Sequence, residues 1–223
     1  MDTAPHATLC YVHDPMCSWC WAFRPVLGRL VAALPDGVAW RRVLGGLAPD
    51  SDAPMPQAMR DSLQATWRRI ERSVPGTRFD HAFWRDNEPR RSTFRACRAV
   101  IAAREQDAAL ETAMIEAIQR AYYLQARNPS DREVLVELAT ALGCERERFA
   151  AALDHPRLHA ALEEERRLAA ALGVRGFPSL VLVDAYGDRD DGADDGATRA
   201  VHVPVDLHDP APMLAVIERR SAA

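Results

Sequence analysis

Apolar residues near the start of the chain form two short runs with a helical stripe between them. Residues 7–12 form a nearly continuous apolar run, which is typical of a strand buried on both faces. Between residues 23 and 34 the apolar positions are three or four apart, which predicts a helix that a Pro-Asp-Gly turn ends. Residues 38–44 form the second run. This order predicts a βαβ unit with a right-handed crossover.

From about residue 49 to residue 156 the pattern predicts helices alone. Four are expected, near residues 59–70, 93–105, 110–122 and 131–142. Ser130 and Glu133 have the spacing of a capping box, in which each side chain binds a free backbone N–H of the other. The five arginines between positions 85 and 98 are expected on a solvated helical face.

The last part of the chain returns to strands. An arginine- and glutamate-rich helix is predicted near residues 158–172, with Glu163 and Arg167 as an i,i+4 ion pair. Strands follow near 179–184 and 199–205, joined by an aspartate-rich loop that is expected to be solvated, and a helix near 213–220 closes the chain. The two strands fit an antiparallel hairpin. The whole order is βαβ, then helices, then αββα, an α/β fold with an all-α insertion.

Composition narrows the choice of function. The 223 residues are 48% hydrophobic and 27% charged, with a net charge of −4, which is ordinary for a globular protein and gives no basic face for nucleic acid. Every basic residue is arginine, so chemistry that needs a lysine Schiff base or a P-loop lysine is excluded. No apolar run is long enough to span a membrane, and the first twelve residues are a poor signal peptide. A cytoplasmic location, where thiols stay reduced, is therefore expected.

The chemistry is expected at two of the five cysteines, Cys17 and Cys20, which form a Cys-Ser-Trp-Cys motif where the first strand turns into the first helix. Free N–H groups and the helix dipole at this place favour an anion on the first cysteine, and the thiolate is the nucleophile of disulfide exchange. A zinc site would need a second pair, which the chain lacks, so no metal is expected. The remaining cysteines, Cys10, Cys97 and Cys144, are expected to be small buried apolar residues.

Several residues around the motif are candidates for tuning the cysteines or for binding substrate. His13 and Asp14 directly precede it, and they either tune Cys17 and carry protons or cap a turn. In this topology Pro178, at the start of the third strand, would face the helix that carries the cysteines. Trp19 and Trp21 are candidates for lining a substrate groove, whereas Phe23 shares the core face of its helix.

The sequence YVHDPMCSWCWAF, the sequence GVRGFPSLVLVD and the helical stretch between them resemble the DsbA-type thioredoxin-fold family. The nearest branch is the cytosolic, FrnE-like one of predicted protein disulfide isomerases. The resemblance implies a thioredoxin-like domain, residues 1–48 and 157–223, interrupted by a helical insertion domain, residues 49–156. It also implies that Pro178 is cis and that the backbone of Phe177 pairs with substrate. Relatives often carry threonine or valine in place of Phe177.

From the resemblance, Cys17 is expected to attack a substrate disulfide and Cys20 to resolve the mixed disulfide, with Ser18 and Trp19 beside the reacting sulfur. The expected partners are protein or small-molecule disulfides and thiols, and a cellular reductant or oxidant. No cofactor is expected, although glutathione is a candidate co-substrate. Two other functions stay open. One is a glutathione-dependent isomerase or transferase of the 2-hydroxychromene-2-carboxylate isomerase or kappa-class type, which generally carries serine at the position of Cys17. The other is a peptide-binding chaperone module.

Overall fold

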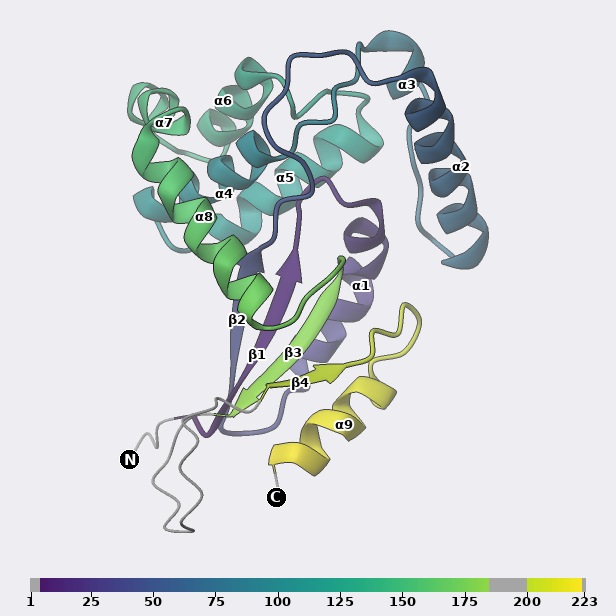
Figure 1. Cartoon of the computed structure of the whole chain (residues 1–223), viewed down its shortest axis with the longest axis vertical. Helices are drawn as coiled ribbons and strands as arrows, with labels where there is room; N and C mark the ends of the chain where they lie inside the picture. Colours follow the sequence, from purple (N-terminus) through teal and green to yellow (C-terminus); the bar gives the residue numbers. More distant parts are fainter. Residues whose placement is uncertain (1–4, 185–199, 222–223) are drawn as a thin grey trace.

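The computed structural model describes residues 5–184 and 200–221 of the chain. Within them, Figure 1 shows a sheet in the lower half of the molecule and most of the helices above it. The strands are β1 (Ala7–His13), β2 (Val38–Leu44), β3 (Ser179–Asp184) and β4 (Ala200–Val203). The helices are α1 (Ser18–Ala32), α2 (Gln57–Ser73), α3 (Phe83–Asp86), α4 (Phe94–Gln106), α5 (Leu110–Leu124), α6 (Arg132–Ala141), α7 (Arg146–Leu153), α8 (Pro156–Ala171) and α9 (Ala211–Ser221).

The four strands form one sheet in the order β2-β1-β3-β4. β1 and β2 are parallel, with Ala7 opposite Val38 and His13 opposite Leu44, as the predicted βαβ unit requires. β3 is antiparallel to both β1 and β4, so the predicted hairpin is confirmed. The mixed α/β fold expected from the order of elements is therefore confirmed.

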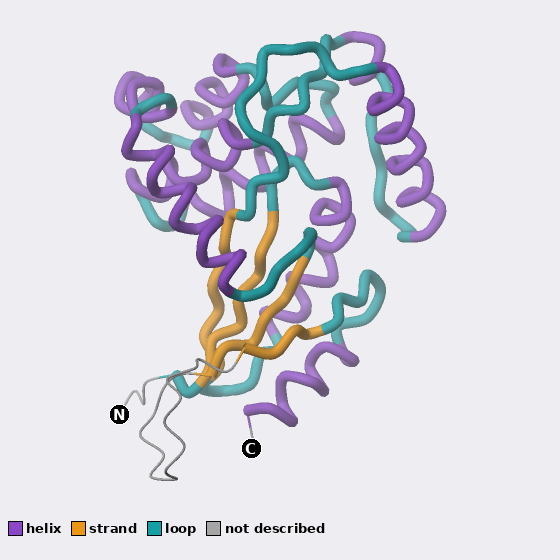
Figure 2. Tube along the Cα trace, viewed as in Figure 1, coloured by secondary structure: helices purple, strands orange, loops and turns teal. Residues whose placement is uncertain are grey.

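Helices cover both faces of the sheet, and this explains the continuous apolar run of β1. Leu9 and Tyr11 point to the face that packs on α1 and α9, together with Leu182 of β3. Cys10 and Val12 point to the opposite face, where the end of α8 packs. Alternate residues of a strand point to opposite faces, so a strand between two layers is apolar at every position. In Figure 2 the strands, in orange, lie between helices on either side.

In the helical region, residues 49–156, the other helices pack around α4. Every residue of α4 from Ala96 to Ala103 is buried, and the helix packs against α5, α6, α7 and α8. The small alanines of α4 let these helices approach closely. A second group of buried aromatic rings surrounds Trp67 of α2, which stacks on Phe79 at 4.8 Å between ring centroids. Helix contacts make up most of the core of this region, and Met16, Trp21, Ala22 and Leu44 of the sheet region join it.

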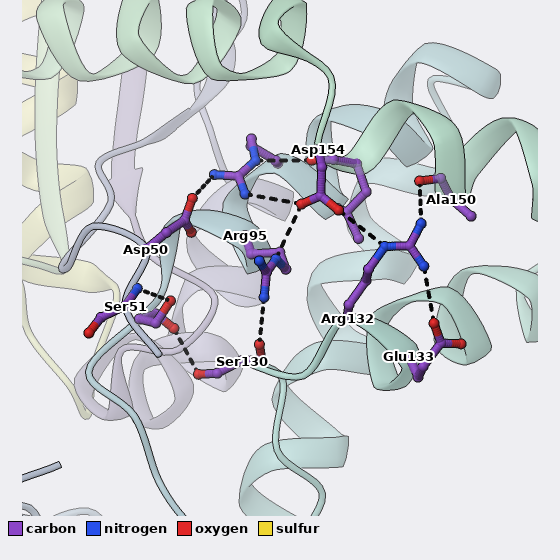
Figure 3. A network of polar contacts seen from close by, with 11 residues as sticks. Asp50, Ser51, Arg95, Ser130, Arg132, Glu133, Ala150 and Asp154 are labelled. Carbon is purple, nitrogen blue, oxygen red and sulfur yellow. Dashed lines mark hydrogen bonds and ion pairs between the residues drawn. The ribbon is translucent and has the colours of Figure 1, made fainter. Parts of the chain in front are cut away.

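One charged residue, Arg98, lies inside this region with only 1% of its side chain exposed. Its guanidinium donates to the carbonyl of Leu153 at 3.0 Å and to Asp50 at 2.8 Å, and it lies 3.8 Å from Asp154. Asp154 also pairs with Arg95 and Arg132, in the network drawn in Figure 3. A buried charge is tolerated only when it is paired in this way. The expectation of a solvated face is therefore wrong for Arg98.

Two local predictions are also wrong. Asp131, not Ser130, is the N-cap of α6, and the Ser130 hydroxyl donates to the carbonyl of Ser92 at 2.8 Å. The serine is held by a neighbouring segment, so it does not cap its own helix. Glu163 pairs with Arg166 at i,i+3, whereas Arg167 is exposed. The short helix α3 was not expected either.

The aspartate-rich loop predicted after β3 lies almost wholly outside the described residues. In the described part of the chain, no helix is long and apolar enough to cross a membrane.

Candidate active site

Cys17 is the N-cap of α1, with φ −84° and ψ 118°. Its backbone N–H donates to the carbonyl of Asp14 at 3.0 Å, which closes the turn between β1 and the helix. Its own carbonyl accepts the first helical hydrogen bond, from Trp21 at 3.0 Å. The backbone N–H groups of Trp19 and Cys20 lower the pKa of Cys17. Unpaired N–H groups at the start of a helix stabilise an anion, so this turn holds Cys17 where a thiolate is favoured.

Cys20 lies behind Cys17, and the two thiols titrate in opposite directions. Both are free thiols, 6% and 1% exposed respectively. The pKa of Cys17 is lowered, chiefly because the Cys20 thiol donates a hydrogen bond to it, against burial and the charge of Asp14. The pKa of Cys20 is raised well above its ordinary value by burial and by the neighbouring Cys17. The first cysteine is therefore the better nucleophile at neutral pH, because it carries the larger share of thiolate.

The segment before β3 faces this pair, as the sequence predicts. In its thiol form Cys17 donates to the carbonyl of Phe177 at 3.6 Å, and the Phe177–Pro178 peptide bond is cis. The ring of Phe177 lies over Gly45, where a Cβ would come within 2.0 Å of the ring. Phe177 and Pro178 are both half-buried. Gly45 therefore makes room for the large side chain that the sequence carries at this position.

Asp14 is fully buried and accepts four hydrogen bonds. Two come from the backbone N–H groups of Met16 and Leu47, each at 2.7 Å. The others come from the Thr93 hydroxyl at 2.6 Å and the Cys97 thiol at 3.6 Å. Burial raises the pKa of Asp14, and these donors oppose the rise. The bond to Met16 is the turn cap that the sequence allowed, and the bonds to Thr93 and Cys97 tie the cysteine turn to α4 and its N-cap.

His13 is buried beside the site but provides no positive charge. Its ring stacks on Tyr11, with 4.8 Å between centroids and 1° between planes. Neither ring nitrogen has a hydrogen-bond partner among the described residues. Burial, followed by the nearby Arg42, lowers the pKa of His13 to about 3. His13 is therefore neutral at physiological pH, so the lowered pKa of Cys17 does not depend on an imidazolium.

Ser18 and Trp19 lie in the first turn of α1. Ser18 is buried, and its hydroxyl makes no hydrogen bond to another described residue. Trp19 is half-buried, and the guanidinium of Arg69 lies 5.1 Å above its ring. Arg69 belongs to α2, so the helical region places an arginine beside the motif.

Tyr11 is a site residue that the sequence analysis missed. It is 3% exposed on β1, and its hydroxyl forms a hydrogen bond with the Cys20 thiol, which lowers the pKa of Cys20. Burial and Cys20 raise the pKa of Tyr11 well above its usual range. A polar tip within an otherwise apolar strand is the signal that could have indicated it.

The other aromatic residues near the motif have different surroundings. Phe23 is fully buried in the core, as predicted. Trp21 is mostly buried and donates its indole N–H to the carbonyl of Arg78 at 3.1 Å.

The three other cysteines, Cys10, Cys97 and Cys144, are all buried, which agrees with the prediction. Within residues 5–184 and 200–221, no group of His, Cys, Asp or Glu side chains is arranged to hold a metal ion.

Comparison with known proteins agrees with this geometry. A family model described as the DSBA-like thioredoxin domain matches residues 8–200. The structure of a proposed protein disulfide isomerase from Nitrosomonas europaea superposes with a TM-score of 0.77, at 22% identity and 96% coverage of each chain. The cytosolic disulfide reductase DsbM from Pseudomonas aeruginosa superposes with a TM-score of 0.70, at 29% identity, over 96% of this chain and 98% of that one.

A structure of the same reductase with GSH superposes with a TM-score of 0.69, at 27% identity, over 97% of this chain and all of that one. Comparison with curated protein sequences gives no significant match.

Proposed function

Because the chain belongs to the DSBA-like thioredoxin family, we propose that it is a thiol–disulfide oxidoreductase whose reactive pair is Cys17 and Cys20. The observation that carries the proposal is the place of Cys17 at the N-cap of α1. There Cys20 and two backbone N–H groups stabilise its thiolate, and the carbonyl of Phe177 lies opposite.

In the reducing direction, the Cys17 thiolate attacks one sulfur of a substrate disulfide. A bond forms between Cys17 and that sulfur, and the other substrate sulfur leaves as a thiolate that takes up a proton. Cys20 then loses its proton and attacks the sulfur of Cys17, which releases the second substrate thiolate. The substrate gains two electrons, and the enzyme ends with a Cys17–Cys20 disulfide. The raised pKa of Cys20 would fall at the second step, because Cys17 carries no negative charge in the mixed disulfide.

The same pair would serve oxidation by the reverse sequence. Isomerisation needs only the first step and its reversal at another sulfur of the substrate. We place the substrate segment along the backbone of Phe177 and Pro178, with Ser18 and Trp19 beside it.

The reductase DsbM supports net reduction in the cytoplasm, and its structure with GSH supports glutathione as the cellular reductant that returns the Cys17–Cys20 disulfide to the dithiol. Two glutathione molecules would supply the two electrons and form one glutathione disulfide. We therefore extend the proposal to net reduction of substrate disulfides, a cytoplasmic location and glutathione as the partner.

Reduction of insulin disulfides by dithiothreitol tests the proposal. Wild-type protein is expected to accelerate the reduction, and Cys17→Ser is expected to lower the added rate to background. Cys144→Ser is the matched control, because it removes a buried cysteine from another part of the fold and should keep the rate within about twofold. Equal rates for wild type and Cys17→Ser would overturn the proposal. Tight glutathione binding by a protein with no dithiol cycling would favour the glutathione-dependent isomerase or transferase instead.

A further inference from the structure

Asp14 is a buried carboxylate that no cation neutralises. It is 0% exposed, and its hydrogen bonds come from two backbone N–H groups, one hydroxyl and one thiol. In the part of the chain that the structure describes, its carboxylate forms no ion pair. Buried charges in proteins are normally paired, as Arg98 is. A buried, unpaired carboxylate beside a reactive thiol therefore indicates a functional role.

The helical region stabilises the charge of this carboxylate. The Thr93 hydroxyl donates to it at 2.6 Å and the Cys97 thiol at 3.6 Å. Thr93 is the N-cap of α4 and Cys97 lies in its first turn, so the carboxylate lies at the positive end of the helix dipole, which stabilises an anion. Burial raises the pKa of Asp14, and these donors oppose the rise. They therefore keep the carboxylate ionised at neutral pH.

The same carboxylate lies next to the reacting thiol. Asp14 precedes Cys17 by three residues, in the turn that the Cys17 N–H closes on the Asp14 carbonyl. The carboxylate accepts from the N–H of Met16, the residue directly before Cys17, at 2.7 Å. Both side chains are buried, and two negative charges repel more strongly where little water screens them. The Cys20 thiol lowers the pKa of Cys17, and the charge of Asp14 opposes this effect.

The other titratable groups at this place carry no charge at neutral pH. Burial raises the pKa of four of them, which are Cys20 of α1, Cys97 of α4, and Tyr122 and Tyr123 of α5. Burial lowers the pKa of His13 to about 3, so it is neutral as well. Charges farther out act on members of this group, and these are Arg91, Arg98 and Glu165. None of the three is among the main causes of the pKa shifts at Asp14 and Cys17.

A fixed negative charge beside Cys17 changes the balance between the two redox forms of the pair. The dithiol form carries the thiolate of Cys17, whereas the disulfide form has no charge on either sulfur. A buried anion therefore raises the free energy of the dithiol form more than that of the disulfide form. A pair whose reduced form is stabilised is an oxidant, and a pair whose reduced form is disfavoured gives up its electrons readily.

We propose that Asp14 makes the Cys17–Cys20 pair a reductant, because its unpaired buried charge opposes the charge of the thiolate and favours the disulfide form. The helical region takes part, since α4 holds the carboxylate in place. The proposal rests on the proposed function, and it assigns the net direction of the reaction to one residue of this chain. Asp14 acts on a substrate only through Cys17, so it is a positioning residue.

The test is the equilibrium of the protein with glutathione. Two glutathione molecules lose two electrons and form one glutathione disulfide, and the Cys17–Cys20 disulfide becomes the dithiol. Acid quenching, alkylation and mass spectrometry measure both forms at a series of glutathione ratios. At about pH 8 the equilibrium constant of Asp14→Asn should shift about tenfold towards the dithiol, which is about 30 mV for a two-electron couple. At about pH 5, where protonation of Cys17 removes the repulsion, it should agree with wild type within about twofold.

Two further variants separate the charge of Asp14 from other effects. Asp36→Asn removes the same charge at an exposed position in the turn after α1, and its equilibrium constant should match that of the wild type within about twofold. Asp14→Ser removes the charge with a smaller side chain, and it should shift the constant in the same direction as Asp14→Asn. It replaces Asp14→Asn in the test if that variant does not fold.

Three results would overturn the proposal. They are an unchanged constant in the variants at Asp14, an equal shift in Asp36→Asn, or a shift of the same size at about pH 5, which would indicate a structural effect of the substitution. Failure of the proposed function gives a different result. In that case no Cys17–Cys20 disulfide would form in the wild type at any glutathione ratio, and both proposals would be rejected.

Discussion

The sheet region (β1–β4, α1 and α9) and the helical region (residues 49–156) are stabilised in different ways. In the sheet region the core is apolar on both faces, and no ion pair joins two of its described residues. In the helical region charged pairs are numerous, and a buried arginine joins α4 to the loop after β2 and to the end of α7. Apolar packing is not directional, whereas a charge network has a fixed geometry and depends on ionisation.

Cys17 and Cys20 belong to the sheet region, and Asp14 connects the sheet region to the helical region. The position of Cys17 follows from β1, α1 and the turn between them, all of which belong to the sheet region. Asp14 lies in that turn but takes two of its hydrogen bonds from Thr93 and Cys97. We therefore expect changes in the helical network to alter stability more than thiol chemistry, and changes at Asp14 to alter both.

The largest effect is expected for Arg98→Ala. The substitution removes a buried side chain with three recorded partners, and we expect the free energy of unfolding to fall by about 3 kcal/mol. Urea denaturation measures this loss. The rate at which iodoacetamide alkylates Cys17 in the folded protein should stay within about twofold.

Arg148→Ala, at an exposed arginine of α7, is the control for Arg98→Ala and should change stability by less than about 0.5 kcal/mol. A loss below about 1 kcal/mol for Arg98→Ala, or a large change in the reactivity of Cys17, would contradict the expectation that the helical network affects stability more than thiol chemistry.

A smaller effect is expected for His13→Phe, and it depends on pH. The pKa of His13 is lowered to about 3 by burial, so the unfolded chain takes up a proton near pH 6.5 and the folded chain does not. Stability is therefore lost as the pH falls below about 6.5. Between pH 7 and pH 5 this group contributes a loss of about 2 kcal/mol, which phenylalanine should remove while keeping the stack on Tyr11.

Urea denaturation at a series of pH values checks this prediction. His159→Phe, at an exposed histidine of α8, is the control and should leave the acid sensitivity as in wild type. Equal slopes of stability against pH for wild type and His13→Phe would show that His13 is protonated in the folded protein.

The smallest change in stability is expected for Asp14→Asn, at about 1 kcal/mol, because an amide oxygen replaces part of the acceptor capacity of the carboxylate. The variant should alter the thiol as well. Ionised Asp14 raises the pKa of Cys17, so its removal should lower that pKa further. The pH dependence of iodoacetamide alkylation measures the shift. A higher pKa in Asp14→Asn would contradict this electrostatic role.

Local patterns in the sequence predicted the sheet, most of the helices and the cysteine turn. The strand β1, the stripe of α1 and the motif between them are decided by neighbouring residues, so periodicity and turn residues are enough to find them. The contacts of Asp14 are different, since Thr93 lies 79 positions away. Arg98 was missed for a related reason. An arginine on a helix is exposed unless distant residues pair with it, and Asp50 and Leu153 come close only in the folded chain.

The most direct measurement is to trap the mixed disulfide and locate it. Cys20→Ser keeps a hydroxyl that can donate to Cys17, but it lacks the sulfur that would resolve the intermediate. After reaction with native insulin, whose chains are joined by disulfides, peptide mapping by mass spectrometry should find the adduct on Cys17, and Cys17→Ser should form none. An adduct on Cys10, Cys97 or Cys144, or no adduct in Cys20→Ser, would contradict the assignment of Cys17 as the attacking thiol.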